Sequence, residues 1–149
     1  DEKWHHKLRW MNALADWIAA DFDPDGLAVL CGDFNLCPTD EDTWDPARWK
    51  GGIFCTAEER ACSQRLLDHG LVDAFREKYP TAFGRFAQTW WDYRAGGYDR
   101  GHGLRIDHHL VTRSLYAHTS AVTIDRKERE GEKPSDHAPV TLHVDFSMP

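Results

Sequence analysis

The sequence predicts an α+β fold in which helices pack on one face of a mixed or antiparallel sheet. Apolar residues recur at helical spacing near the N-terminus, whereas the last stretch alternates apolar and polar residues as a half-buried strand does. Helical and strand patterns are mixed along the chain, with only one clear strand–helix alternation, which favours this layered arrangement. The 149 residues, 41% of them hydrophobic and 29% charged, suit one globular domain.

Two helices and one strand are predicted in the first 70 residues. Residues 3–20 are predicted to form an amphipathic helix, because apolar side chains share one helical face at Trp4, Leu8, Met11, Ala15 and Ile18. A turn at 23–26 leads into the apolar run 27–31, which is typical of a fully buried strand. A second helix begins at a capping box, Thr56 to Glu59, and ends at Gly70.

The rest of the chain combines a short helix with four predicted strands. Residues 71–79 are predicted as the helix, which ends before Pro80. The strands are predicted at residues 87–93, 104–112, 120–124 and 140–146. A glycine-rich loop at 94–103 and a charged loop at 126–133 join the later elements.

Composition narrows the class of protein. The formal net charge of −7 argues mildly against a generic nucleic-acid binder, because such proteins are usually basic. A metal site, however, needs acidic ligands, and the bound metal restores positive charge where a phosphate binds. The four cysteines show no CxxC spacing, so we expect reduced thiols and no zinc site. There is no run of 18 apolar residues and no signal-peptide pattern, so we expect no membrane partner and a cytoplasmic location.

The motif Gly32-Asp33-Phe34-Asn35 follows the apolar run directly. Side chains alternate along extended backbone, so Asp33 and Asn35 are expected to point the same way. Gly32 allows a tight exit from the strand. A carboxylate and a carboxamide at the end of a strand indicate a divalent-metal or proton-transfer site.

Two later motifs carry the same chemistry, Asp107-His108 and Ser135-Asp136-His137. Each of the three aspartates also has a purely structural explanation. Asp33 could form the turn after the strand, Asp107 could be paired with a buried partner, and Asp136 could be an ordinary acid in a loop. An aspartate that holds a histidine in one tautomer is, however, a recurring catalytic dyad. Asp33, Asn35 and Asp136 together make an all-oxygen set suited to Mg²⁺.

These motifs resemble the endonuclease/exonuclease/phosphatase superfamily. The resemblance is carried by Gly32-Asp33-Phe34-Asn35, by residues 103–107 (GLRID) and by residues 135–140 (SDHAPV). Residues 35–40 (NLCPTD), 70–76 (GLVDAFR) and 90–94 (WWDYR) look more narrowly like exonuclease III, the bacterial apurinic/apyrimidinic endonuclease. The resemblance covers essentially the whole chain. It implies hydrolysis of DNA phosphodiesters that depends on Mg²⁺ or Mn²⁺, as in base-excision repair.

The resemblance also implies a role for each matched residue. Asp33 would orient or deprotonate the attacking water, and Asn35 would help to hold it and the phosphate. Asp107 would orient His137, which would contact the scissile phosphate and stabilise its developing charge. Asp136 would be a metal ligand, with Asp33, Asn35 and His137 as further candidate ligands. The physical logic is metal-assisted in-line displacement.

The implied partner is double-stranded DNA with abasic sites or 3′ ends. Trp90, Leu104 and Ile106 fall where the family forms an apolar pocket for a flipped-out abasic sugar. The alternative for Trp90 is core packing. Three arginines are expected to surround the pocket and to contact DNA phosphates. Alternatively, they lie in a solvated loop without such a role. These arginines are Arg94, Arg100 and Arg105.

In this family a full domain is about twice as long, and the motifs above belong to its C-terminal half. We therefore expect residues 1–149 to be that half, with the N-terminal half absent. The fold would be half of a four-layer α/β-sandwich, DNase I-like. An uncovered sheet face would favour a homodimer. The N-terminal half of the family's domain also supplies a glutamate that binds the metal, and its absence would make nuclease activity weak or absent. The alternatives are a superfamily phosphatase or phospholipase acting on another phosphoester, and a non-catalytic dimerising remnant.

Overall fold

The computed structural model describes residues 1–147, in which every strand pairing is antiparallel. The strands form one three-stranded and two two-stranded sheets. The three-stranded sheet has the order β1 (Val29–Asp33), β5 (Asp107–Thr112), β2 (Leu71–Asp73). The small sheets pair β3 (Trp90–Trp91) with β4 (Gly103–Leu104), and β6 (Thr119–Ile124) with β7 (Val140–Val144).

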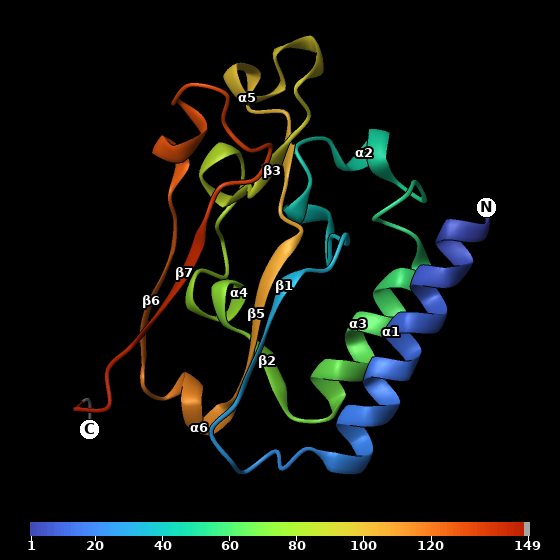
Figure 1. The fold of residues 1–149 in the computed structure, drawn as a ribbon, viewed down its shortest axis with the longest axis vertical. Helices are drawn as coiled ribbons and strands as arrows, with labels where there is room; N and C mark the ends of the chain where they lie inside the picture. Colours follow the sequence, from blue (N-terminus) through green and yellow to red (C-terminus); the bar gives the residue numbers. More distant parts are fainter. Residues whose placement is uncertain (148–149) are drawn as a thin grey trace.

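Two long helices, α1 (Glu2–Asp21) and α3 (Ala57–Asp68), lie side by side on one face of the three-stranded sheet (Figure 1). The capping box of α3 forms as predicted: the Thr56 hydroxyl accepts the Glu59 N–H, and the Glu59 carboxylate accepts the Thr56 N–H. Both helices and their covering of one face agree with the sequence prediction, and the α+β fold class is confirmed.

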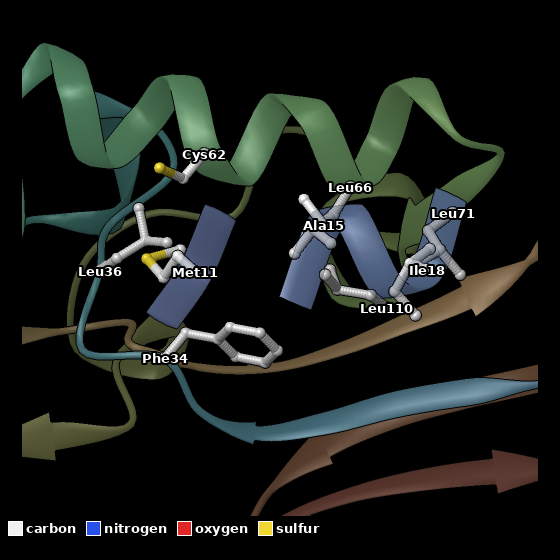
Figure 2. Close-up of a cluster of buried hydrophobic side chains, with 9 residues drawn as sticks. All are labelled: Met11, Ala15, Ile18, Phe34, Leu36, Cys62, Leu66, Leu71 and Leu110. Atoms are coloured by element: carbon white, nitrogen blue, oxygen red, sulfur yellow. The ribbon is translucent and has the colours of Figure 1, made fainter. Parts of the chain in front are cut away.

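Figure 2 shows how the helices bury their apolar faces against the sheet. Met11, Ala15 and Ile18 of α1 are buried at the spacing of one helical face. They meet Leu66 of α3 and Leu110 of β5 in one continuous cluster. Removing this much apolar surface from water is the main force that holds the helical layer on the sheet.

A second core lies on the other face of the same sheet. Leu110 packs on the helix side, and its neighbour Val111 packs into the second cluster, as the alternation of side chains along a strand requires. Phe75 of α4 (Ala74–Lys78) and Val122 of β6 fill this cluster. The β6–β7 hairpin therefore lies on the side of the sheet away from α1 and α3 (Figure 1).

Short helical turns occupy the connections. Three are α-helical: α2 (Pro46–Trp49), α5 (Gly97–Arg100) and α6 (Arg113–Tyr116). Four are 3₁₀ turns: η1 (Asp40–Asp42), η2 (Arg85–Ala87), η3 (Arg94–Gly96) and η4 (Arg126–Arg129). In the described part of the chain no helix combines the length and the apolarity needed to span a membrane.

Three predicted elements differ from the structure. The predicted helix 71–79 is instead β2 followed by α4, because the Asp73 carboxylate caps the helix by accepting the Arg76 N–H. The predicted strand 87–93 shortens to β3, since η2 precedes it. The predicted strand 104–112 divides into β4 and β5, which pair with different partners.

The strand at the first motif is not buried as predicted. Val29 of β1 keeps 46% of its surface exposed, and Cys31 and Gly32 are also exposed. β1 is the edge of its sheet, and the face opposite the helices has little cover at this point. An apolar run indicates that a strand is buried in the folded protein. It does not show which other segment packs against the strand.

Candidate active site

Two facing carboxylates form the base of the candidate site. β1 and β5 place Asp33 directly opposite Asp107, so both side chains project from the same face of the sheet. Leu110 lies three residues after Asp107 in β5 and packs on the helix side of the sheet. Because side chains alternate along a strand, Asp107 and Asp33 point to the opposite face, away from the helices. Gly32 has φ +148°, a backbone conformation that other residues rarely adopt.

The loop that ends at His137 is held against β3 by backbone bonds. The Trp91 N–H donates to the Asp136 carbonyl at 3.0 Å, and the Ala138 N–H donates to the Thr89 carbonyl at 2.8 Å. Trp90 and His137 form an isolated antiparallel bridge. These contacts carry His137 across to the face that holds Asp33 and Asp107.

His137 lies between three carboxylates. Its Nδ1 is 2.9 and 3.1 Å from the two oxygens of Asp107. Its Nε2 is 3.7 Å from Asp33 Oδ2 and 4.0 Å from Asp136 Oδ1. The structure thus brings four of the predicted residues together, in the order Asp107, His137, then Asp33 and Asp136.

The pairing sets the tautomer and charge of His137. A carboxylate only accepts hydrogen bonds, so Nδ1 donates its proton to Asp107 and Nε2 is left facing Asp33 and Asp136. The hydrogen bond to Asp107 raises the pKa of His137, burial opposes this, and the charges of Asp107, Asp33 and Asp136 raise it further. The site therefore favours an imidazolium, which is suited to stabilising negative charge on a substrate.

The oxygen donors at this site fit a hard divalent cation. Asp33, Asp107 and His137 offer ligand atoms that lie within 4.8 Å of one another, but Asp107 and His137 are hydrogen-bonded to each other. The freer donors are the carboxylates of Asp33 and Asp136. Asp136 Oδ2 accepts the Trp90 Nε1–H at 2.9 Å, which leaves Oδ1 available. One or two carboxylates together with waters are what Mg²⁺ requires.

Asn35 is exposed beside the site. Its own N–H donates to Asp33 Oδ1 at 2.8 Å, and its φ of 49° is left-handed, a conformation that asparagine tolerates better than most residues. A hollow of about 270 Å³ adjoins Asp33 and Asp107 and is also lined by His109 and Pro139. The arrangement can hold a water between an acid and a phosphate.

Comparison with known proteins agrees with this chemistry. The sequence profile of the Endonuclease/Exonuclease/phosphatase family matches residues 1–137. The chain belongs to this family. It is 38% identical over 146 residues to exodeoxyribonuclease III of Haemophilus influenzae, covering 94% of this chain and 54% of that protein.

Two solved structures share the fold. A 3′ phosphatase from Neisseria, bound to a product DNA hairpin, superposes with a TM-score of 0.92 at 40% identity and covers 98% of this chain and 56% of that one. An AP endonuclease from Archaeoglobus fulgidus gives a TM-score of 0.92 at 33% identity, with the same coverage of each chain. The predicted resemblance to the exonuclease III and AP endonuclease branch is confirmed, and the chain spans about half the length of these relatives.

Of the three residues predicted to form the apolar pocket, only Trp90 keeps part of its surface exposed. Trp90 is half-buried and lies directly opposite Leu104 in the β3–β4 pair. Leu104 and Ile106 are fully buried with Cys37 and Cys55 in a third cluster. Trp90 can face a ligand, whereas Leu104 and Ile106 support it from below.

Arg105 does not face solvent, which corrects the prediction that it contacts DNA. Only 1% of it is exposed, and its guanidinium pairs with Asp42 at 2.6 Å and with Asp73 at 2.6 Å. Nδ1 of the buried His108 lies 3.1 Å from the same guanidinium. Burial, and then the charge of Arg105, lower the pKa of His108. Arg105 therefore organises the interior beneath the site.

The other two arginines are exposed. Arg94 forms a bidentate pair with Asp92, at 3.0 to 3.1 Å from Nε and 2.7 Å from Nη2. Arg94 is therefore already paired with an acid two residues away. Arg100, at the end of α5, makes no ion pair within residues 1–147 and is free to meet a phosphate.

Sequence reasoning missed two supports of the site. The buried Thr89 hydroxyl accepts the N–H groups of Ile106 and Asp107, at 3.1 and 3.2 Å, and so fixes the start of β5. The Lys7 ammonium of α1 pairs with Glu59 and donates to the Asn35 carbonyl, which ties the first motif to the helical layer. Neither residue stands out by type or spacing, because the groups that Thr89 and Lys7 bond at the site are backbone N–H and carbonyl groups, which every residue carries.

Proposed function

We propose that the chain forms part of a metal-dependent DNA phosphodiesterase of the exonuclease III and AP endonuclease type. The observation that supports this best is the Asp107–His137 pair aimed at Asp33, with Nε2 of His137 3.7 Å from the Asp33 carboxylate. In the proposed reaction Asp33 orients and deprotonates the attacking water, and Asn35 helps to hold it. His137 donates from Nε2 to the scissile phosphate.

Asp107 keeps His137 oriented and charged. Its hydrogen bond to Nδ1 favours the imidazolium, so positive charge is in place where the phosphoryl oxygens gain negative charge. A donor that is already oriented requires little reorganisation during the reaction, which is why such preorganised charge has a large effect on rate.

Asp136 is the proposed ligand of Mg²⁺ or Mn²⁺, with Asp33, Asn35 and His137 as its further surroundings. A bound cation would neutralise charge on the phosphate and lower the pKa of the attacking water. Trp90 holds Asp136 in place through the indole N–H. The proposed substrate is duplex DNA with an abasic site or a 3′ end, for which the exposed Arg100 and the half-buried face of Trp90 provide contacts.

We infer that these 149 residues alone hydrolyse DNA weakly. The site offers the carboxylates of Asp136 and Asp33 to a cation, but each already accepts a hydrogen bond on one oxygen, from the Trp90 indole and from the Asn35 N–H, so one oxygen of each remains. The test is a single-turnover assay of an abasic duplex with excess protein and Mg²⁺. Slow incision that EDTA, Asp33→Asn and His137→Gln abolish supports the proposal. Faster hydrolysis of inositol phosphates than of DNA would favour the phosphatase alternative. A single-turnover rate constant for incision of about 1 s⁻¹ or more, within the ordinary range of enzymes, would refute the inference of weak activity.

A second candidate, association of two copies, is favoured by the exposed edge strand β1. Leu27 and Val29 keep 59% and 46% of their surfaces exposed beside unpaired edge backbone. Burying this surface against a second copy would remove apolar area from water and pair the edge. Sedimentation velocity should show dimers at micromolar concentration that Val29→Lys converts to monomers; a parental monomer would refute the idea.

A further inference from the structure

The loop that carries Asp136 and His137 projects from a hairpin that is already closed. β6 and β7 pair up to Ile124 opposite Val140, and the Asp125 N–H then donates to the Pro139 carbonyl at 2.9 Å. Residues 126–138 therefore form a loop that begins and ends where the β6–β7 pairing ends. The hairpin does not determine where this loop places its side chains, so other contacts must do so.

Arg129 of this loop is buried without an acidic partner. Only 7% of it is exposed, yet within residues 1–147 no carboxylate pairs with it and its Nε finds no hydrogen-bond partner. Its guanidinium carbon instead lies 5.9, 5.4 and 5.1 Å from the ring centres of Trp91, Tyr93 and Tyr98. A buried guanidinium surrounded by aromatic rings is held by cation–π attraction, and guanidinium suits this because it is weakly hydrated.

The same rings are fastened to the loop on both sides of Arg129. The Tyr98 hydroxyl lies 3.1 Å from the Arg126 carbonyl and 2.8 Å from the Glu130 carboxylate. The Tyr93 hydroxyl donates to the Pro134 carbonyl at 2.7 Å, two residues before Asp136. The ring set therefore clamps the loop before and after Arg129.

Trp91 connects this clamp to the reacting groups. Its ring is fully buried, and its Nε1–H donates to Gln88 Oε1 at 2.7 Å, which fixes the orientation of the ring. Its backbone N–H donates to the Asp136 carbonyl. Trp91 thus faces Arg129 with its ring and bonds Asp136 with its backbone, and so links the two residues.

We propose that Arg129 is a positioning residue for Asp136 and His137. Its guanidinium, stacked among Trp91, Tyr93 and Tyr98, holds the 126–138 loop at the distance where Asp136 meets the cation and His137 meets the phosphate. The role of those two residues rests on the proposed function, whereas the positioning itself does not. Arg129 touches neither the substrate nor the cation.

The test is residue-resolved amide hydrogen exchange on the full chain with Arg129→Met, which keeps an unbranched apolar stem and removes the guanidinium and its charge. The matched control is Lys127→Met, in the same 3₁₀ turn but exposed. Exchange of the Trp91 and Ala138 amides, which close the junction at Asp136, should accelerate about tenfold or more in Arg129→Met and less than twofold in the control. Amides of the β6–β7 ladder should stay within twofold in both.

Equal acceleration of the ladder amides would show a purely structural role and overturn the proposal, as would unchanged Trp91 and Ala138 amides. Arg129→Lys, which restores a cation over the rings, should recover most of the protection. If Arg129→Met does not fold, Tyr93→Leu removes one exposed ring of the clamp and should accelerate the same two amides at least threefold; no acceleration would overturn the proposal.

A second measurement links the clamp to the cation. Titration with Mn²⁺, followed by electron paramagnetic resonance, should show about tenfold weaker binding in Arg129→Met and unchanged binding in Lys127→Met, as is typical when the support of a metal ligand is lost. Equal affinities in all three proteins would overturn the link to Asp136. If the parental chain binds no Mn²⁺, the proposed metal function fails, while the exchange data still decide the positioning role.

Discussion

Replacing Asp42 with asparagine should destabilise the chain severely, because Asp42 is the centre of a buried ion network. One oxygen accepts from Arg105 at 2.6 Å and from Arg76 at 2.7 Å. The other accepts from the N–H and hydroxyl of Thr39, at 3.0 and 2.9 Å. Asp42→Asn keeps the shape but removes the charge, and its N–H₂ group must face either the two guanidinium groups or the N–H and hydroxyl of Thr39. Breaking a buried pair from one side costs about 3–5 kcal/mol, a large part of the roughly 5–15 kcal/mol that holds a domain folded.

The control for this prediction is Asp40→Asn, two residues earlier in the same turn. Asp40 also pairs with an arginine, Arg60 at 2.9 Å, but its side chain is 62% exposed. Exposed pairs contribute about 0–1 kcal/mol. Urea denaturation of both variants measures the difference, with equal slopes required for the comparison. A loss below about 1 kcal/mol for Asp42→Asn, or equal losses for the two variants, would refute the reasoning.

The same network predicts a pH dependence. Burial alone would raise the pKa of Asp42, but the charge and hydrogen bond of Arg105 more than reverse this, so the pKa lies below its ordinary value. A carboxyl group with a depressed folded pKa stabilises the fold above its unfolded pKa of about 3.9 and ceases to do so as pH falls through the folded value. The stability difference between the parent and Asp42→Asn should therefore shrink below about pH 4.

Three further outcomes are expected. Asp107→Asn should lower the pKa of His137 toward its ordinary value of about 6.5, because it removes the hydrogen bond that raises this pKa; NMR titration measures the change, and an unchanged pKa would contradict the assignment. In the parent, the stabilisation of the fold by this pair is complete below the unfolded pKa of His137 and is lost as pH rises through the raised folded pKa. Thr56→Ala should cost about 1 kcal/mol in urea denaturation through loss of the α3 cap, and no measurable cost would contradict the role of the capping box. Trp90→Phe should weaken Mn²⁺ binding about tenfold by calorimetry, because Asp136 loses its indole N–H donor; unchanged affinity would show that Asp136 needs no such support.

Local signals explain the elements that could be predicted from the sequence. The face Met11–Ala15–Ile18 and the Thr56 capping box each act within a few residues, so their pattern is complete in the sequence. The burial of β1 could not be read in this way. An apolar run does not say whether the strand lies inside a sheet or at its edge, and Val29 lies at the edge.

The candidate site shows a similar division. Residue type and position single out Asp33 after a predicted strand, Asp107 within another and His137 beside Asp136, because polar side chains in or next to a strand need a partner. The structure brings Asp33, Asp107 and His137 together, with ligand atoms within 4.8 Å of one another. Charge type could not separate Arg105, which is buried in ion pairs, from Arg100, which is exposed. That difference depends on carboxylates that lie far away in the sequence, at Asp42 and Asp73.

The antiparallel register that sets Asp33 opposite Asp107 also has a consequence for the time course of folding. These two residues and His137 come from distant parts of the sequence, so the site forms only after long loops have closed. The entropic cost of such closure precedes any gain from the contacts, and non-local pairings slow the search for the native state. α1 can form within about a microsecond on its own, whereas the imidazole of His137 reaches Asp107 only once the strands have met. The environment of His137 therefore reports when these distant segments have met, and its ring resonances in time-resolved NMR should become native later than the circular dichroism of the helices.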